Sequence, residues 1–249
     1  LNADITVVDL ADRILPSILD VRAGEIMQKH IEDKGTKFIL GTSVEQFSKN
    51  SAKLTNGDTV DFDILVVAVG VRPNTELVSD AGGKVEKGII TDLHQQTTID
   101  NVYAAGDCTV SHDCSSNTDR ILALLPNAFM QGEVAGKNMA GEETLYLNAI
   151  PMNAIGFYGL HIITAGSYDG DEDITEDADK EIYKKLVFKD GLLKGFILMG
   201  DVARAGIYTS MIKEQIPLTE VDLDLLREKP QMMMFGKARR EEKLAGKKH

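Results

Sequence analysis

The sequence predicts an α/β protein whose parallel sheet is followed, toward the C-terminus, by a small α+β unit. Continuous apolar runs in the N-terminal part, such as residues 64–69, are typical of buried parallel strands. They alternate with a stretch of helical periodicity, as expected for strands covered by helices. Farther along, two apolar runs flank Asp190-Gly191, which predicts an antiparallel hairpin instead of a further parallel strand.

The N-terminal part contains the predicted sheet and its covering helix. Leu19, Ala23 and Met27 recur at helical spacing, and Gly35 follows as a helix stop. Asn56-Gly57 predicts a tight hairpin turn. The predicted elements are a strand at 5–9, a helix over about 19–31, a strand at 37–40, a hairpin of 52–54 with 59–61, and a central strand at 64–69.

The remaining elements divide between a middle and a C-terminal stretch. Gly132 and Gly136 weaken the helix predicted in the middle stretch, so we expect a neighbour to pack closely against its backbone. The predicted elements are strands at 88–91 and 102–105, a helix over about 127–140, a hairpin of 182–188 with 192–199, and a helix over about 202–213.

Charge and hydropathy exclude several partners. The 249 residues carry a formal net charge of −12, which argues against nucleic acid as a partner. No apolar run approaches the roughly 18 residues that cross a bilayer, and no signal peptide is recognised at the N-terminus. Two cysteines, Cys108 and Cys114, without metal-ligand spacing predict no disulfide framework, no metal site and a reducing, cytoplasmic location.

Three further segments are interpreted as surface features. The acidic residues between 169 and 179 resemble a calcium loop, but Ile174 occupies the position that requires glycine, so we expect an acidic surface loop, with partner docking as the alternative. The methionine-rich segment 232–235 is expected to pack on a surface. The basic residues 237–249 are expected to form a solvated, frayed end.

Two strand ends carry carboxylates that suit nucleotide binding. Asp9 ends the first predicted strand, where an acid can bind ribose hydroxyls and disfavour a 2′-phosphate. The alternative, and the more usual role of an Asp at a strand end, is a solvated loop residue or a cap. The glycine-rich loop expected about 20 residues earlier would precede Leu1. Gly106 and Asp107 end the strand at 102–105, where a glycine permits close approach and a carboxylate can bind a polyol; a simple tight turn is the alternative.

Two segments together resemble the pyridine nucleotide–disulfide oxidoreductase family. Residues 61–74 are similar to the segment that links the family's NAD and FAD domains, and residues 98–108 resemble its second FAD motif. The resemblance extends from residue 4 to about 218. It implies incomplete FAD/NAD(P)-binding three-layer domains followed by a small α+β domain. The implied boundaries are 1–70 for the NAD part, 71–146 for the FAD part, 147–218 for the C-terminal domain and 219–249 for a charged tail.

The resemblance also implies roles for individual residues. Asp107 would bind the FAD ribityl hydroxyls, with Gly106 beside it and the Cys108 amide near the pyrophosphate. Cys108 itself is interpreted as a small buried residue, not a nucleophile. No acid, base or nucleophile is assigned. The other implied cofactor residues are Pro126, Asn127 and Ala128 at a helix N-terminus facing the flavin, Asp9 at the NAD ribose, and Val69 and Gly70 beside the nicotinamide cofactor.

In the C-terminal stretch, residues 150–153, 157–160 and 184–200 are similar to the small C-terminal domain of NADH–rubredoxin reductases and to the FAD-containing part of nitrite reductase large subunits. These similarities imply an FAD-dependent oxidoreductase that passes electrons from NADH to a rubredoxin-like protein or another acceptor. Because both glycine-rich phosphate loops are missing, we expect a fragment that binds flavin weakly or not at all. The alternative is a truncated, non-catalytic module that self-associates or pairs with a missing N-terminal chain.

Overall fold

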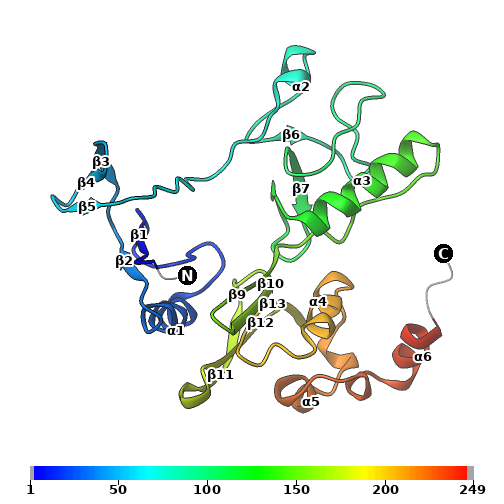
Figure 1. Cartoon of the computed structure of the whole chain (residues 1–249). Coiled ribbons are helices and arrows are strands. Elements are labelled where there is room, and N and C mark those ends of the chain that lie inside the picture. Colours follow the sequence, from blue (N-terminus) through cyan, green and yellow to red (C-terminus); the bar gives the residue numbers. More distant parts are fainter. Residues whose placement is uncertain (1–2, 246–249) are drawn as a thin grey trace.

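The computed structural model of the chain describes residues 3–245 (Figure 1). Its elements form three groups: β1–β5 with α1, then α2, β6–β8 and α3, and finally the sheet β9–β13 with α4 beside it. Within the described part of the chain, no helix is both long and apolar enough to cross a bilayer.

The first group confirms most of the predicted N-terminal elements. β1 (Thr6–Val8) and β2 (Lys37–Ile39) pair in parallel, and α1 (Val21–Glu32) is the helix that connects them. The predicted hairpin is also present, within an antiparallel sheet of β3 (Val44–Phe47), β4 (Ser51–Leu54) and β5 (Thr59–Asp61).

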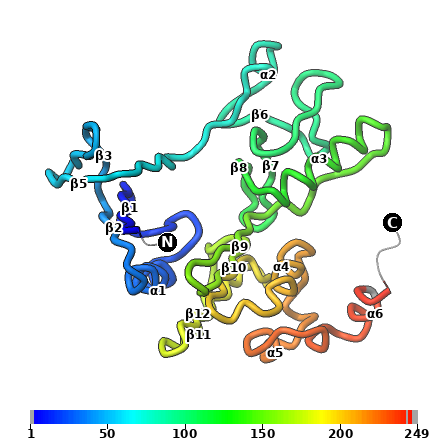
Figure 2. The backbone as a smooth tube through the Cα atoms, viewed as in Figure 1, coloured from blue at the N-terminus to red at the C-terminus, as the bar shows by residue number. Residues whose placement is uncertain are grey.

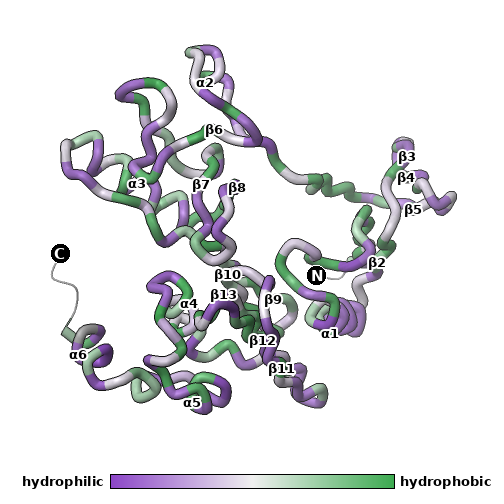
Figure 3. Tube along the Cα trace, turned by 180° about the vertical axis from the view of Figure 1, so that it is seen from behind, coloured by the Kyte–Doolittle hydropathy of each residue, from purple (hydrophilic) through white to green (hydrophobic). Residues whose placement is uncertain are grey.

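The central strand predicted at residues 64–69 is wrong for this structure. The segment is extended but belongs to no described sheet. It connects β5 to α2 (Glu76–Asp80) with no helix or strand beside it (Figure 2). Its apolar side chains are exposed, by 83% at Ile64 and 91% at Val69, and Figure 3 shows the same segment as hydrophobic. The physical reason is that no strand among residues 3–245 pairs with its backbone.

The middle group contains a small mixed sheet and one long helix. β6 (Ile89–Ile90) pairs in parallel with β7 (Thr109–Asp113), and β7 pairs antiparallel with β8 (Thr118–Ile121). The strand predicted at 102–105 is not formed, because Tyr103 makes only an isolated bridge to Gln96.

The predicted middle helix is confirmed as α3 (Leu125–Met139). Its outer face is bare: Leu125 is 85% exposed and Phe129 73% exposed. A Cβ atom added at Gly132 or Gly136 would meet nothing within 4 Å. The close neighbour that these glycines predicted is therefore absent among the described residues.

The C-terminal group is a five-stranded antiparallel sheet in the order β11-β12-β13-β10-β9. The predicted hairpin is confirmed as β12 (Ile182–Lys189) and β13 (Leu192–Met199), with positive φ at Asp190 and Gly191 in its turn. The predicted acidic loop is wrong, because most of it forms the edge strand β11. Charged side chains are common on edge strands, where they discourage pairing with other chains. The other strands are β9 (Met152–Phe157), β10 (Leu160–Gly166) and β11 (Asp171–Asp177).

Helices cover both faces of this sheet. Alternate side chains of a strand point to opposite faces, so Phe196 and Leu198 pack toward α4 (Ala205–Lys213) while Ile197 and Met199 pack toward α1. The α4 side also includes α5 (Leu223–Glu228) and a 3-10 helix at Met232–Met234. The predicted helix over 202–213 is confirmed with a later start.

The last described segment is more ordered than the sequence predicted. Met234 and Phe235 are each 2% exposed, which confirms that the methionine-rich segment packs against the protein. The frayed end is wrong for α6 (Lys237–Ala245), a helix held by Arg239–Glu220 and Lys243–Glu214 contacts of 2.9 Å. Residues 246–249 of that prediction lie outside the described part.

Candidate functional site

The turn at Gly106 and Asp107 lies directly against α3. Gly106 has a φ of 91°, in the left-handed region that favours glycine. A Cβ added at Gly106 would lie 3.7 Å from the Cβ of Ala128 in the first turn of the helix. Two of the groups that the sequence singled out are therefore neighbours, although 22 residues of chain separate them.

Asp107 leaves its carboxylate available. The residue is exposed, and no hydrogen bond or ion pair found within residues 3–245 involves its side chain. The backbone N–H groups of Asp107 and Cys108 likewise have no protein partner among the described residues. By contrast, the N–H of Thr109 donates to the carbonyl of Gly106 at 3.0 Å and closes the turn. The turn thus offers one acceptor group and two donors.

Neither cysteine has the surroundings of a reactive thiol. Cys108 is half-buried, and its thiol donates weakly to the carbonyl of Ala105 at 3.6 Å. Cys114 is buried, and this burial, together with the neighbouring charge of Asp113, raises the pKa of its thiol. A raised pKa lowers the fraction of thiolate, which is the nucleophilic form.

Gln131 is a buried residue that the sequence reasoning missed. Its side chain is 1% exposed and reaches from α3 to the turn, where Oε1 accepts a hydrogen bond from the Gly106 N–H at 2.5 Å. The only available signal was an amide on the inward face of a predicted helix, three residues after Ala128. That position alone gives no partner, because the contact depends on how the turn docks.

The N-terminus of α3 carries unsatisfied donors. Leu124 precedes the helix without any side-chain cap, and Pro126 occupies its first turn. Leu125 and Pro126 are exposed. The first N–H groups of a helix and its dipole favour negative charge, so this end suits an anionic group of a ligand.

Asn127 faces the protein interior. The residue is fully buried; its Nδ2 donates to the carbonyl of Ile150 at 3.0 Å, and its Oδ1 accepts from the Tyr146 hydroxyl at 3.0 Å. Burial raises the pKa of Tyr146, which keeps this hydroxyl a donor. Asn127 therefore anchors the start of α3 to the segment that leads into β9.

The residues expected at a nicotinamide cofactor lie elsewhere. Asp9 is exposed at the end of β1, where its Oδ1 accepts from the Ala11 N–H at 2.9 Å, as a loop cap does. Val69 is exposed, and Gly70 has a φ of 96° within the extended segment. β1 and α3 lie on opposite sides of the molecule (Figure 1), so the structure does not gather the two predicted sets in one place.

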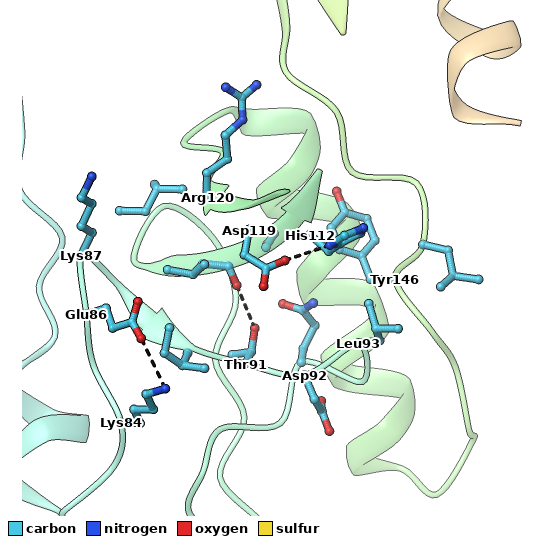
Figure 4. Close-up of a pocket in the computed structure, with 16 residues that line it drawn as sticks. Lys84, Glu86, Lys87, Thr91, Asp92, Leu93, His112, Asp119, Arg120 and Tyr146 are labelled. Carbon is cyan, nitrogen blue, oxygen red and sulfur yellow. Dashed lines mark hydrogen bonds and ion pairs between the residues drawn. The ribbon is translucent and has the colours of Figure 1, made fainter. Parts of the chain in front are cut away.

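A cavity of about 1070 Å³ lies beside β6, β7 and β8, and it shares no residue with the predicted cofactor set. Two pairs of its lining side chains contact each other: His112 Nδ1 is 2.8 Å from Asp119 Oδ1, and Lys84 Nζ is 3.3 Å from Glu86 Oε1 (Figure 4). Across the described residues, no cluster of three or more His, Cys, Asp or Glu side chains is placed to hold a metal. The candidate site therefore rests on the turn and α3.

Two family models match the chain. The model described as pyridine nucleotide-disulphide oxidoreductase matches residues 1–132, just over half of the 249 residues. The model described as rubredoxin NAD+ reductase C-terminal domain matches residues 151–216, which correspond to most of the C-terminal sheet and α4.

Relatives with assigned names match over most of the chain. The epsilon subunit of NADH-dependent phenylglyoxylate dehydrogenase from Aromatoleum evansii is 32% identical over 229 residues, covering 88% of this chain and 54% of the relative. Rubredoxin-NAD(+) reductase from Acinetobacter baylyi is 29% identical over 230 residues, covering 89% and 55%. The chain thus spans about half the length of these relatives.

Solved structures share the fold. A NAD-dependent persulfide reductase from A. fulgidus has a TM-score of 0.78 at 24% identity, covering 88% of this chain and 46% of that one. The covalent putidaredoxin reductase–putidaredoxin complex contains a chain with a TM-score of 0.81 at 20% identity, covering 92% and 56%. The first family model matches more than half of the residues, and the chain accordingly belongs to the pyridine nucleotide-disulphide oxidoreductase family.

Proposed function

We propose that the chain supplies the ribityl-binding turn and flavin-facing helix of an FAD-dependent NADH oxidoreductase. One observation carries this proposal: Asp107, whose carboxylate has no partner among the described residues, stands on a glycine turn that is hydrogen-bonded to α3 and lies near its uncapped N-terminus. FAD and NAD(H) are the cofactors of the family to which the chain belongs. The residues present fit the FAD part of that pair.

Each part of the turn has a distinct role in the proposed site. The Asp107 carboxylate accepts hydrogen bonds from sugar-alcohol hydroxyls. The Asp107 and Cys108 amides, which have no partner in the described part of the chain, suit a phosphate oxygen. Gly106 leaves space for close backbone approach. The N-terminus of α3, at Pro126 and Ala128, lowers the cost of negative charge on the flavin edge. FAD held by these residues would supply the redox chemistry, as the acceptor of a hydride from NADH.

Asn127 has a different proposed role from its neighbours. Its side chain is committed to Tyr146 and Ile150, so it fixes the helix start that faces the cofactor and does not reach the cofactor itself. Asp9 is proposed to bind the ribose of NAD and to disfavour a 2′-phosphate, with Val69 and Gly70 beside the nicotinamide cofactor. The second Asp9 oxygen, Oδ2, has no described protein partner and can accept the ribose hydroxyls.

A small redox protein is the proposed electron acceptor. The match of residues 151–216 to a rubredoxin reductase domain supports this, as do relatives named for rubredoxin and putidaredoxin. An NADH oxidase from Streptococcus pneumoniae, 33% identical over 173 residues, makes a small oxidant the alternative acceptor.

For the domain boundaries, we propose that residues 1–70 belong to the NAD-binding domain and residues 71–146 to the FAD-binding domain. The core of the C-terminal unit extends to Phe235.

Flavin binding by the purified chain tests the proposal. Asp107→Ala removes the charged acceptor and is expected to weaken FAD binding about tenfold or more, as loss of a charged hydrogen-bonding group does. Asp100→Ala is the matched control, since it removes an equal charge from an exposed site earlier in the same segment. Equal FAD affinity in both variants would remove Asp107 from the site and the proposal with it.

A second candidate function is a module that pairs through the segment at 64–71. Four of its side chains, Ile64, Val66, Val69 and Val71, are each at least 80% exposed. An extended apolar segment with unpaired backbone is a template for strand addition by another chain. This candidate predicts association of the chain with itself or with another polypeptide, and it is compatible with flavin binding at the turn.

A further inference from the structure

We propose that Gln131 is a positioning residue of the flavin site, whose buried amide holds the Gly106–Asp107 turn at a fixed place on α3. The inference rests on the proposed function, because it concerns the same turn. It adds a residue that the family motifs in the sequence did not identify. It also separates the Gly106 N–H, which binds Gln131, from the N–H groups of Asp107 and Cys108, which are proposed to bind the ligand.

The contacts of Gln131 join three parts of the site. Its Oε1 accepts from the Gly106 N–H at 2.5 Å and lies 3.2 Å from the Thr109 hydroxyl, whose single proton it shares with the Gly106 carbonyl at 2.8 Å. Its Nε2 donates to the Ser111 hydroxyl oxygen on β7. A side chain that is 1% exposed therefore connects the helix, the turn and the following strand. Both ends of the amide are used, which is the arrangement expected of a buried polar group.

These contacts give the residues of the turn two roles: Gly106 is bound by the protein, and Asp107 and Cys108 are left to face a ligand. The Gly106 N–H is consumed by Gln131, and the Gly106 carbonyl accepts from both the Thr109 N–H at 3.0 Å and the Thr109 hydroxyl at 2.8 Å. The N–H groups of Asp107 and Cys108 keep no described protein partner. Gly106 thus contributes shape to the site, while the next two residues contribute hydrogen bonds.

The hydrogen bonds of Gln131, which we call the Gln131 clamp, also fix the Asp107 carboxylate relative to α3. Gln131 lies about one helical turn after Ala128, the residue whose Cβ would be 3.7 Å from a Cβ added at Gly106. The hydrogen bond from the Gly106 N–H to Oε1 then fixes the turn relative to the helix N-terminus. A ligand that uses both groups finds them already in place, and preorganisation of this kind saves the ordering cost of binding.

Two substitutions of Gln131 separate its hydrogen bonds from its volume. Gln131→Met keeps the length of the side chain and removes both polar ends, which leaves the Gly106 N–H without its acceptor. Gln131→Glu keeps two oxygen acceptors for Gly106 and Thr109, and Ser111 can reorient to donate. Gln28→Met is the matched control, because Gln28 is a helical glutamine whose only described side-chain bond is to the exposed Glu32.

Two readouts are needed, and the first does not require flavin. Amide hydrogen exchange at Gly106 is expected to accelerate at least about tenfold in Gln131→Met and to stay near the parent rate in Gln131→Glu and Gln28→Met. FAD affinity is expected to fall about tenfold in Gln131→Met and to be largely restored in Gln131→Glu. If Gln131 only filled space, Gln131→Glu would not restore FAD affinity relative to Gln131→Met.

The outcomes distinguish this inference from the proposed function. Unchanged Gly106 exchange in a folded Gln131→Met protein would overturn the inference. So would a Gln131→Met protein with parent FAD affinity when Asp107→Ala has lost it. If exchange accelerates while neither variant changes FAD binding, the clamp stands and the flavin assignment fails. Should Gln131→Met not fold, Thr109→Val removes the hydroxyl that Oε1 and the Gly106 carbonyl share, and it is expected to show about a threefold change in both readouts. No change would overturn the inference.

Discussion

Lys185 Nζ lies 3.0 Å from Asp20 Oδ2, and this contact joins the C-terminal sheet to the start of α1. Asp20 is also the N-cap of α1, where its Oδ1 accepts from the Ala23 N–H, and its Oδ2 accepts from the Tyr183 hydroxyl at 2.8 Å. The Lys185 side chain is 5% exposed and reaches Glu172 as well. One carboxylate therefore supports both a helix terminus and a buried cation between two units.

Replacing Asp20 is expected to destabilise the chain strongly. Asp20→Ala removes the helix cap and leaves Lys185 with one acidic partner, for an expected loss of about 2 kcal/mol in the free energy of unfolding. Asp33→Ala is the control, since the Asp33–Lys29 pair lies on the surface and is expected to change stability by about 0.5 kcal/mol or less. Urea unfolding followed by circular dichroism measures both. Equal losses would contradict this role for Asp20.

Acid should weaken the same contact. Burial pushes the pKa of Asp20 upward, but hydrogen bonds from Ala23, Tyr183 and Lys185 outweigh it, and the net pKa is lowered. A lowered pKa gives stability that is present above the unfolded-state value of about 3.9 and is lost as pH falls through the folded-state value. The stability difference between the parent and Asp20→Asn should therefore be constant near neutral pH and shrink below about pH 4. A constant difference down to pH 3 would rule out this linkage.

Two glycine substitutions are expected to have opposite signs. Gly106→Ala forces a side chain into a left-handed conformation, which costs about 1 kcal/mol. Gly132→Ala lies on the bare face of α3, where an added Cβ meets nothing within 4 Å, and it should stabilise the helix by up to about 1 kcal/mol. Thermal unfolding of both variants provides the comparison. Destabilisation by Gly132→Ala would show that this helix face is covered in solution.

The exposed segment at residues 64–71 should control self-association of the chain. Val66 is 80% exposed, so Val66→Asp costs the isolated chain little, but it places a charge where another strand would pair. Sedimentation velocity over a range of concentrations should show association of the parent chain and a shift toward monomer in Val66→Asp. Val21→Asp, at an exposed valine on α1, should leave the association unchanged. A parent chain that is monomeric at all concentrations would argue against self-association through this segment.

Sequence reasoning succeeded where an element finds its partner within the described chain. The hairpin of β12 and β13 has local turn chemistry and an adjacent partner, and α1 has an apolar face that the sheet covers. Residues 64–69 and 102–105 have the composition of buried strands, but composition reports a tendency to be buried and does not supply a neighbouring strand. Both remain outside the sheets for this reason.

Other differences come from long-range contacts. β11 lacks apolar alternation, and its pairing with β12 determines its structure. α6 is a polar helix supported by Glu220 and Glu214, which no local pattern reveals. In the candidate site, the sequence predicted the neighbours Gly106 and Ala128 through a resemblance, but it did not predict that Gln131 clamps the turn or that Asn127 faces inward. Those contacts depend on the docking of α3.

The position of FAD on the chain is the most direct test of the central claim. Titration of FAD into isotope-labelled protein, followed by amide chemical shifts, locates a ligand even when binding is weak. We expect concentration-dependent shifts at Asp107, Cys108 and Leu125, with the Asp107→Ala variant losing them. Shifts confined to the cavity beside β6 and β7, at residues such as Thr91 and Arg120, would contradict the assignment of the flavin site to the turn and α3.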